Sequence, residues 1–217
     1  GTNWVQAAKL KASDGAASDY FGFAVSINGD RVAVGAYMDD DKGTNSGSAY
    51  VFERSGTNWV QAAKLTASDG VGSDYFGYSL DICGDRVVIG AYLDDDKGSN
   101  SGSAYIFQVS GTNWTQTAKL TATDGAAGDY FGLSVSLSAD RIAVGACYDD
   151  DMGSSSGSAY LYTYTGSGWS LVDKMLPADG AAADYYGYSV SVSEHDMLVG
   201  AYQNDDAGSA SGSAYVY

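Results

Sequence analysis

Residues 19–36 read Asp-Tyr-Phe-Gly-Phe-Ala-Val-Ser-Ile-Asn-Gly-Asp-Arg-Val-Ala-Val-Gly-Ala. Apolar and polar residues alternate on both sides of Asn28-Gly29-Asp30, which predicts two short antiparallel strands joined by a tight hairpin. The second of these strands is expected over residues 31–37, and two more are expected over residues 48–52 and 59–65. The segment therefore predicts a four-stranded antiparallel sheet.

This pattern recurs four times at a constant spacing of 55 residues. The markers of each copy are Trp4, Trp59, Trp114 and Trp169, and the Phe-Gly or Tyr-Gly pairs at Phe21, Phe76, Phe131 and Tyr186. A fixed period of this length means that each copy is one structural unit that buries its apolar faces against its neighbours. We expect a single region over residues 1–217, with repeats at about 1–55, 56–110, 111–165 and 166–217.

Four-stranded sheets repeated around an axis are the blades of a β-propeller, so we predict an all-β protein of four 55-residue, four-stranded antiparallel blades. The chain opens on the strand expected at residues 4–10 and closes on the strand expected at 214–217. The first strand could therefore complete the last sheet and close the ring. The alternatives are a closed four-bladed ring and a part of a larger or dimeric ring.

The charge of the chain is strongly negative. There are 27 acidic and 11 basic residues, for a formal net charge of −16, and only Glu53 and Glu194 among the acids are glutamate. Short Asp side chains concentrate in turns and in oxygen-ligand sites for hard cations. So acidic a surface predicts no nucleic-acid partner, and with no apolar run of spanning length we expect no membrane insertion.

Several residues are expected to serve the packing of the fold. Phe21 and its equivalents should wedge between blades, with Gly22 allowing a close approach or a positive φ angle. The repeated Trp is likewise expected to pack between blades. Cys83 and Cys147 occupy different places in their repeats, so two free thiols are favoured over a disulfide.

The stretch at residues 19–36 resembles the FG-GAP repeat of integrin-alpha-type propellers, and residues 39–52 are similar to the variant found in bacterial and algal surface proteins. The resemblance covers all four copies. It implies a β-propeller outside the cell or on its surface that serves adhesion, ligand binding or scaffolding, often with calcium in the blade loops. The integrin-type calcium loop, Asp-x-Asp-x-Asp-Gly, is missing because the first hairpin is the tight turn at Gly29. Its ligands therefore cannot be transferred to this chain.

Acidic residues do recur in two other loops of each repeat, which should emerge on the same rim. One set follows the second strand: Asp39, Asp40, Asp41, Asp94, Asp95, Asp96, Asp149, Asp150, Asp151, Asp205 and Asp206. The other set precedes the aromatic-Gly pair: Asp14, Asp19, Asp69, Asp74, Asp124, Asp129, Asp179 and Asp184. Adjacent carboxylates repel, and Ca²⁺ accepts six to eight oxygen ligands. The sequence thus predicts calcium in these loops, with turn capping and surface solubility as the alternative.

The sequence favours a binding or scaffold protein over an enzyme. His195 has no histidine at the equivalent positions of the other repeats, and no nucleophile, phosphate-loop or zinc motif is present. We expect an extracellular adhesion or surface-scaffold module whose partner is a protein or glycan at a cell surface or matrix, with self-association as a further possibility. The alternative is a carbohydrate-binding propeller that uses Trp and Tyr pockets between blades.

Overall fold

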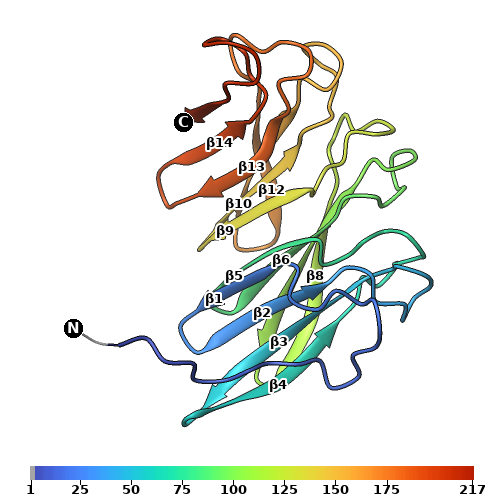
Figure 1. Ribbon diagram of the computed structural model, residues 1–217, viewed down its shortest axis with the longest axis vertical. Coiled ribbons are helices and arrows are strands. Elements are labelled where there is room, and N and C mark those ends of the chain that lie inside the picture. Colours follow the sequence, from blue (N-terminus) through green and yellow to red (C-terminus); the bar gives the residue numbers. More distant parts are fainter. Residues whose placement is uncertain (1–2) are drawn as a thin grey trace.

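A computed structural model describes residues 3–217, which form a series of four antiparallel sheets that we call blades 1 to 4 (Figure 1). Blade 1 consists of β1 (Val25–Asn28), β2 (Arg31–Ala36), β3 (Ser48–Ser55) and β4 (Asn58–Leu65). Blade 2 consists of β5 (Ser79–Cys83), β6 (Arg86–Ala91), β7 (Ser103–Ser110) and β8 (Asn113–Leu120). Blade 3 consists of β9 (Ser134–Ser138), β10 (Arg141–Ala146), β11 (Ser158–Tyr164) and β12 (Trp169–Met175). Blade 4 consists of β13 (Tyr186–Val192), β14 (Met197–Ala201) and β15 (Ser213–Val216).

Strand order within each sheet follows the chain, and the outermost strand of blades 1 to 3 comes from the following repeat. The predicted hairpin is confirmed, because Asn28 pairs with Arg31 and Gly29 adopts a φ of 58°. All four predicted strands of the first sheet are present, within three residues of their expected ends. The all-β, four-repeat architecture is therefore as the sequence predicts.

The expected strand at residues 4–10 does not form, and the ring is not closed by it. Residues 3–24 contain no strand, and blade 4 has three strands. In Figure 1 blades 1 and 4 lie at opposite ends of the long axis, so the N-terminal segment is far from β15. Without a neighbouring strand, the segment has no ladder of backbone hydrogen bonds to hold it as a strand.

Consecutive blades are joined by an aromatic wedge and by glycine contacts, as expected. Phe76, Phe131 and Tyr186 are completely buried, and Phe76 packs in a cluster with residues of both blade 1 and blade 2. A Cβ atom added to Gly90 would lie 1.9 Å from the carbonyl oxygen of Gly132 in the next blade. Neighbouring blades therefore pack with their backbones in direct contact, which fixes the angle between them.

The first strands of successive blades, β1, β5, β9 and β13, pack against one another along the inner side of the arc. Both cysteines are free thiols, as the sequence favours, and Cys147 is buried. Within residues 3–217, no helix is long and apolar enough to cross a membrane.

Candidate functional site: acidic clusters and an aromatic rim

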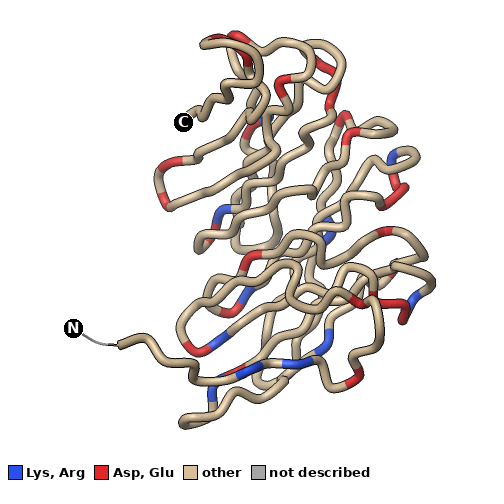
Figure 2. The backbone as a smooth tube through the Cα atoms, in the orientation of Figure 1, with Lys and Arg blue, Asp and Glu red and all other residues tan. Residues whose placement is uncertain are grey.

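Blades 1 to 3 each contain a lysine surrounded by carboxylates. In blade 2 the Lys119 Nζ atom lies 2.8 Å from Asp69 Oδ2 and 3.1 Å from Asp94 Oδ2, and it also pairs with Asp96. The equivalent groups are Lys64 with Asp14, Asp39 and Asp41, and Lys174 with Asp124, Asp149 and Asp151. Acidic residues gather in the loops at the blade ends (Figure 2). The two predicted acidic loops therefore meet on one rim, with an ammonium group between them.

The first Asp of each triplet is buried and accepts hydrogen bonds at both carboxylate oxygens. Asp94 Oδ1 accepts hydrogen bonds from the Asp96 backbone N–H and the Ser103 hydroxyl, and Oδ2 accepts from the Tyr105 hydroxyl at 2.8 Å and from Lys119. Burial, followed by the charge of Asp94, raises the pKa of Tyr105. Burial alone would raise the pKa of Asp69, but the hydrogen bond and charge of Lys119, together with hydrogen bonds from the backbone and Tyr105, leave the pKa below its ordinary value. The cluster is a compact unit in which one ammonium group bridges three carboxylates through charge-assisted hydrogen bonds and ion pairs.

Two other sets of predicted ligands shape loops instead of facing the lysine. The Asp74 carboxylate accepts a hydrogen bond from the Val71 backbone N–H, and burial raises its pKa to about 6. The same bond is made by Asp19, Asp129 and Asp184. The middle triplet residues Asp40, Asp95 and Asp150 each accept from a backbone N–H five residues later. These side chains cap turns, as the alternative interpretation expects.

The fourth cluster contains acids but no lysine among the described residues. It comprises Asp179, Asp205 and Asp206, with Asn204 in the place of the buried Asp. Burial and the charge of Asp179 raise the pKa of Asp206, and burial and the hydrogen bond to Asp179 raise the pKa of Tyr215 to about 12. The residue equivalent to Lys64 by the 55-residue period is Lys9, which is exposed.

The lysines are the site residues that the sequence analysis missed. Their spacing of 55 residues was a sufficient signal, since Lys9, Lys64, Lys119 and Lys174 recur as regularly as the tryptophans. Within residues 3–217, no group of three or more acidic, His or Cys side chains has the geometry to hold a metal ion. Calcium binding by these loops stays a prediction of the sequence.

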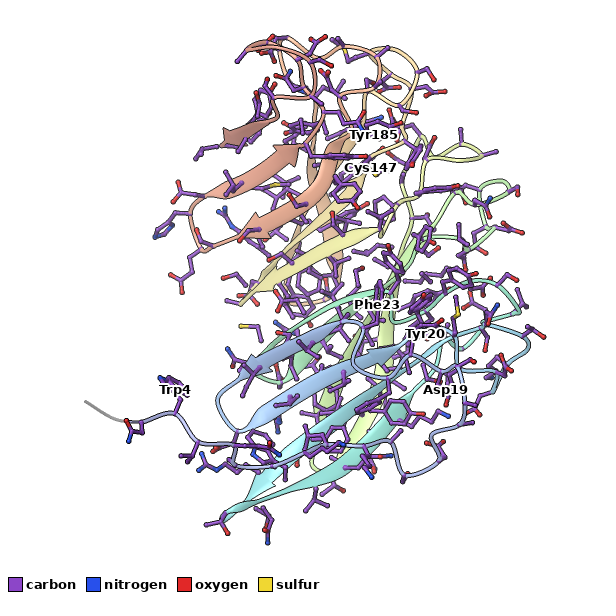
Figure 3. All side chains as sticks on the ribbon, in the orientation of Figure 1. Trp4, Asp19, Tyr20, Phe23, Cys147 and Tyr185 are labelled. Carbon is purple, nitrogen blue, oxygen red and sulfur yellow. The ribbon has the colours of Figure 1, made fainter. Side chains whose placement is uncertain are left out.

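A second feature, which we call the aromatic rim, runs across all four blades. It consists of Tyr20, Phe23, Tyr37, Tyr75, Tyr78, Tyr92, Tyr130, Tyr148, Tyr185, Tyr188 and Tyr202, whose successive ring centroids lie 4.5–5.8 Å apart. Figure 3 labels Tyr20 and Phe23 near blade 1 and Tyr185 beside Cys147 further along the arc. At the ends of the rim, Tyr20 is 56% exposed and Tyr202 is 46% exposed.

The backbone of the rim is unusual. Tyr20, Tyr75, Tyr130 and Tyr185 all adopt φ angles of 54–58°, a left-handed conformation that bulky residues rarely adopt. Its recurrence at one place in every repeat means that the surrounding packing imposes it, and such enforced outliers cluster at binding sites. Each of these Tyr rings contacts an aromatic ring one or two positions beyond the second strand of its own blade, and the last three also contact the corresponding ring of the preceding blade.

Two of the four tryptophans pack between blades, as expected, and Trp59 and Trp4 do not. The Arg31 guanidinium carbon lies 5.6 Å from the centroid of the Trp114 ring, and that of Arg86 lies 5.8 Å from the Trp169 ring. Trp59 packs against the core of blade 1. Trp4 differs, because its side chain is completely exposed (Figure 3).

Comparison with known proteins agrees with this architecture. The sequence model of the FG-GAP repeat matches residues 4–52, 59–107, 114–162 and 169–217. No curated protein matches the sequence. The crystal structure of Saccharomyces cerevisiae Sqt1 superposes with a TM-score of 0.51 at 11% identity, over 87% of this chain and 44% of that chain. The crystal structure of the computationally designed Ika4 protein superposes with a TM-score of 0.55 at 14% identity, over 97% of both chains. The chain thus spans less than half the length of Sqt1, and these likenesses support the fold alone.

Proposed function

Because the chain belongs to the FG-GAP repeat family, we propose that it is a propeller-type binding module that serves adhesion or scaffolding at a cell surface or in an extracellular matrix. The observation that carries this proposal is the aromatic rim. Partly exposed Tyr rings offer large rigid contact area together with a hydroxyl, and they lose little conformational entropy on binding. A continuous band of such rings is the kind of surface that engages a protein or glycan partner.

The polar residues of the blades support a binding role over catalysis. The buried carboxylate of each lysine cluster, Asp39, Asp94 or Asp149, accepts hydrogen bonds from a Lys and a Tyr side chain, which supports a structural role over one as general acid or base. His195 lies in the exposed turn between β13 and β14. We therefore propose a module without enzymatic activity.

Carbohydrate binding is the second candidate, and it also rests on the rim. Sugar rings stack on exposed aromatic faces, and Tyr20, Tyr188 and Tyr202 present such faces. The tryptophans do not contribute to this candidate, because arginine side chains already cover Trp114 and Trp169. A sugar site would thus lie on the rim and not in the pockets between blades.

The test compares binding of the labelled protein to a glycan array and to surfaces coated with matrix proteins. The rim variant combines Tyr20→Ser and Tyr202→Ser, and the control is Val172→Ser, which removes an exposed apolar residue of β12. Binding that is lost in the rim variant but kept in the control supports the proposal, and the ligand type distinguishes adhesion from carbohydrate recognition. Binding that is equal in both variants, or absent from the unmodified protein, contradicts it.

Calcium is a separate part of the proposed function, with its own test. A lysine ammonium and a Ca²⁺ ion are two ways to remove the same repulsion between carboxylates. Thermal unfolding in millimolar calcium and in a chelator, at matched ionic strength, separates specific binding from screening. A calcium-specific rise in melting temperature supports calcium-stiffened loops. Equal melting temperatures with calcium and with chelator contradict calcium binding and leave the lysines as the groups that offset the repulsion between the carboxylates.

A further inference from the structure

The same interface recurs between blades 1 and 2, 2 and 3, and 3 and 4. At each, a glycine at the end of the second strand faces the carbonyl oxygen of the next Phe-Gly or Tyr-Gly pair. The pairs are Gly35 with Gly77, Gly90 with Gly132, and Gly145 with Gly187, and an added Cβ would lie 1.9–2.0 Å from each oxygen. The equivalent glycine of blade 4 is Gly200, and the three heavy atoms nearest its added Cβ all belong to Ser189 of the same blade. Blade 4 thus presents an interface with no blade behind it.

The face of blade 4 that points away from blade 3 exposes apolar residues whose equivalents in blade 2 are buried. Leu198 is 44% exposed and Val216 is 72% exposed, whereas the equivalent Val88 and Ile106 of blade 2 are completely buried. The face of blade 1 that points away from blade 2 is exposed in the same way. Val25 and Ile27 are each 66% exposed, whereas the equivalent residues of blade 2 are at most 8% exposed. Those equivalent residues are Leu80 and Ile82.

The missing outer strand of blade 4 leaves an open groove of about 640 Å³. It is lined by Leu176, Ala178, Asp179, Ala214, Tyr215, Val216 and Tyr217. In blades 1 to 3 this place is taken by the strand that begins the following repeat. In blade 1, for example, Tyr50 pairs with Lys64 and Val51 pairs with Ala63. The 55-residue period assigns residues 3–10 to the groove, with Ala214 opposite Leu10, Tyr215 opposite Lys9 and Val216 opposite Ala8.

The charges fit the same register. Lys64, Lys119 and Lys174 each bridge the two acidic loops of a blade. A strand in this register places the exposed Lys9 among Asp179, Asn204 and Asp206, the one cluster without a lysine among the described residues. The Gln61 side chain of blade 1 accepts a hydrogen bond from the Ser13 backbone N–H, and Gln116 accepts one from Ser68. Gln6 stands at the equivalent position of the free strand.

We propose that a second copy of this chain occupies the open face of blade 4, with residues 3–10 of each copy forming the outer strand of blade 4 in the other. Two copies then form a two-fold ring in which every blade has four strands and every interface has the same contacts. The complementary charges of Lys9 and the fourth acidic cluster set the register. The exposed edge of β15, otherwise a template for unspecific pairing, is covered.

A second copy fits better than closure within one chain because the blades cannot easily change their angle. Blades 1 and 4 lie at opposite ends of the molecule (Figure 1), and bringing them together requires all three interfaces to bend. At each interface backbone meets backbone with no space for one added carbon, so bending there creates clashes on one side and gaps on the other. Two copies join without any change to these contacts.

A disulfide trap distinguishes the occupants of the groove. The protein carries Ala8→Cys and Val216→Cys in a Cys83→Ser background, since these positions correspond to the paired Ala63 and Val51. The proposal predicts that mild oxidation gives a covalent species of twice the 22.5 kDa chain mass on a non-reducing gel. A covalent bond within one chain, seen as a monomer of altered mobility, or no bond at all, overturns it. The two single-cysteine variants control for chance contact through the remaining thiol.

Two further variants keep the proposal testable without new cysteines. Gly200→Ala adds a methyl group where a carbonyl oxygen of the second copy would lie, and Lys9→Glu reverses the charge that enters the acidic cluster. We expect each to weaken association by at least about tenfold while the chain stays folded. Lys11→Glu makes the same charge change two residues away and should leave association intact. Equal association of all three variants and the unmodified protein overturns the proposal.

Discussion

Lys119 lies 2.8 Å from the carboxylate of Asp69, a residue fifty positions earlier in the chain. The same ammonium group pairs with Asp94 and Asp96, so it joins the loop before blade 2, the loop after β6 and the outer strand β8. Asp94 is only 5% exposed, and a buried carboxylate needs a partner to stay ionised. Each lysine therefore fixes the two loops of its blade to the strand supplied by the next repeat.

Lys119→Met should destabilise the fold strongly. The substitution keeps the length and packing of the side chain but leaves the buried Asp94 carboxylate without its counter-charge, which costs about 3 kcal/mol. Urea unfolding measures the change. The matched control is Lys97→Met, because Lys97 is exposed in the neighbouring loop and its loss should cost less than about 0.5 kcal/mol. Equal effects of the two substitutions would show that the ammonium group is not structural.

Stability should rise as the pH falls from about 6 toward 4. Burial raises the folded-state pKa of Asp74 to about 6 from an ordinary value of 3.8, and burial raises that of Asp129 as well. The folded protein therefore binds these protons more tightly than the unfolded chain, and stability is lost as the pH rises through this window. Melting temperatures measured between pH 4 and pH 7 test this.

The opposite behaviour is expected below about pH 4. The hydrogen bond from Lys64 lowers the pKa of Asp14, so the stability that this carboxylate contributes is present above pH 3.8 and is lost as the pH falls further.

Asp74→Asn keeps the acceptor for the Val71 N–H and removes the charge, so it should flatten the profile of stability against pH between pH 4 and pH 6. The exposed Asp30→Asn should leave it unchanged, and a profile that Asp74→Asn does not alter would contradict the assignment.

Gly90→Ala should be among the most damaging single substitutions in the chain. The added Cβ would lie 1.9 Å from the Gly132 carbonyl oxygen, and the backbone there cannot move without opening the interface between blades 2 and 3. Overpacking of this kind costs about 3 kcal/mol. Gly168→Ala is the control, since no atom lies within 4 Å of its added Cβ. Denaturation midpoints that match for the two variants would refute the close approach of the blades.

Substitution of a rim tyrosine by asparagine should lower the stability of the fold more in the middle of the aromatic rim than at its end. Tyr130 contacts Tyr92 at 5.3 Å and Tyr148 at 4.6 Å between ring centroids, whereas Tyr20 contacts Tyr37 at 5.6 Å. Asn tolerates the left-handed backbone of both positions, so the difference comes from the rings. Tyr130→Asn should lose about 1 kcal/mol, and Tyr20→Asn should change stability by less than about 0.5 kcal/mol. Calorimetry of the two variants measures this, and the reverse order would contradict the packing of the rim.

Repetition made most of the fold predictable from the sequence. The alternation on both sides of Gly29 and the 55-residue period specify the strands, their order and the number of blades. The strand expected at residues 4–10 has the same sequence pattern as β4, but it lacks a neighbouring edge, and strand formation requires one. Pairing with a distant edge is a property of the assembly, which local pattern cannot specify.

The acidic site was only half predictable for a related reason. The Asp residues form a recognisable motif because they are adjacent in the sequence. The prediction that both acidic loops lie on the same rim followed correctly from the strand order. The lysine that joins them comes from the next repeat, twenty-five residues beyond Asp94, so proximity in the sequence does not reveal it. The aromatic rim was also missed, since its rings come from separate positions of one repeat, as with Tyr75 and Tyr92, and from neighbouring blades, as with Tyr37 and Tyr75.

The most direct test of the proposed two-copy ring is the mass of the unmodified protein in solution, measured by light scattering over a concentration series. The account predicts a stable species of twice the 22.5 kDa chain mass, and in Lys9→Glu a shift toward the single chain at concentrations where the unmodified protein is paired. A mass of one chain at every concentration would contradict it and would leave the open face of blade 4 to some other occupant.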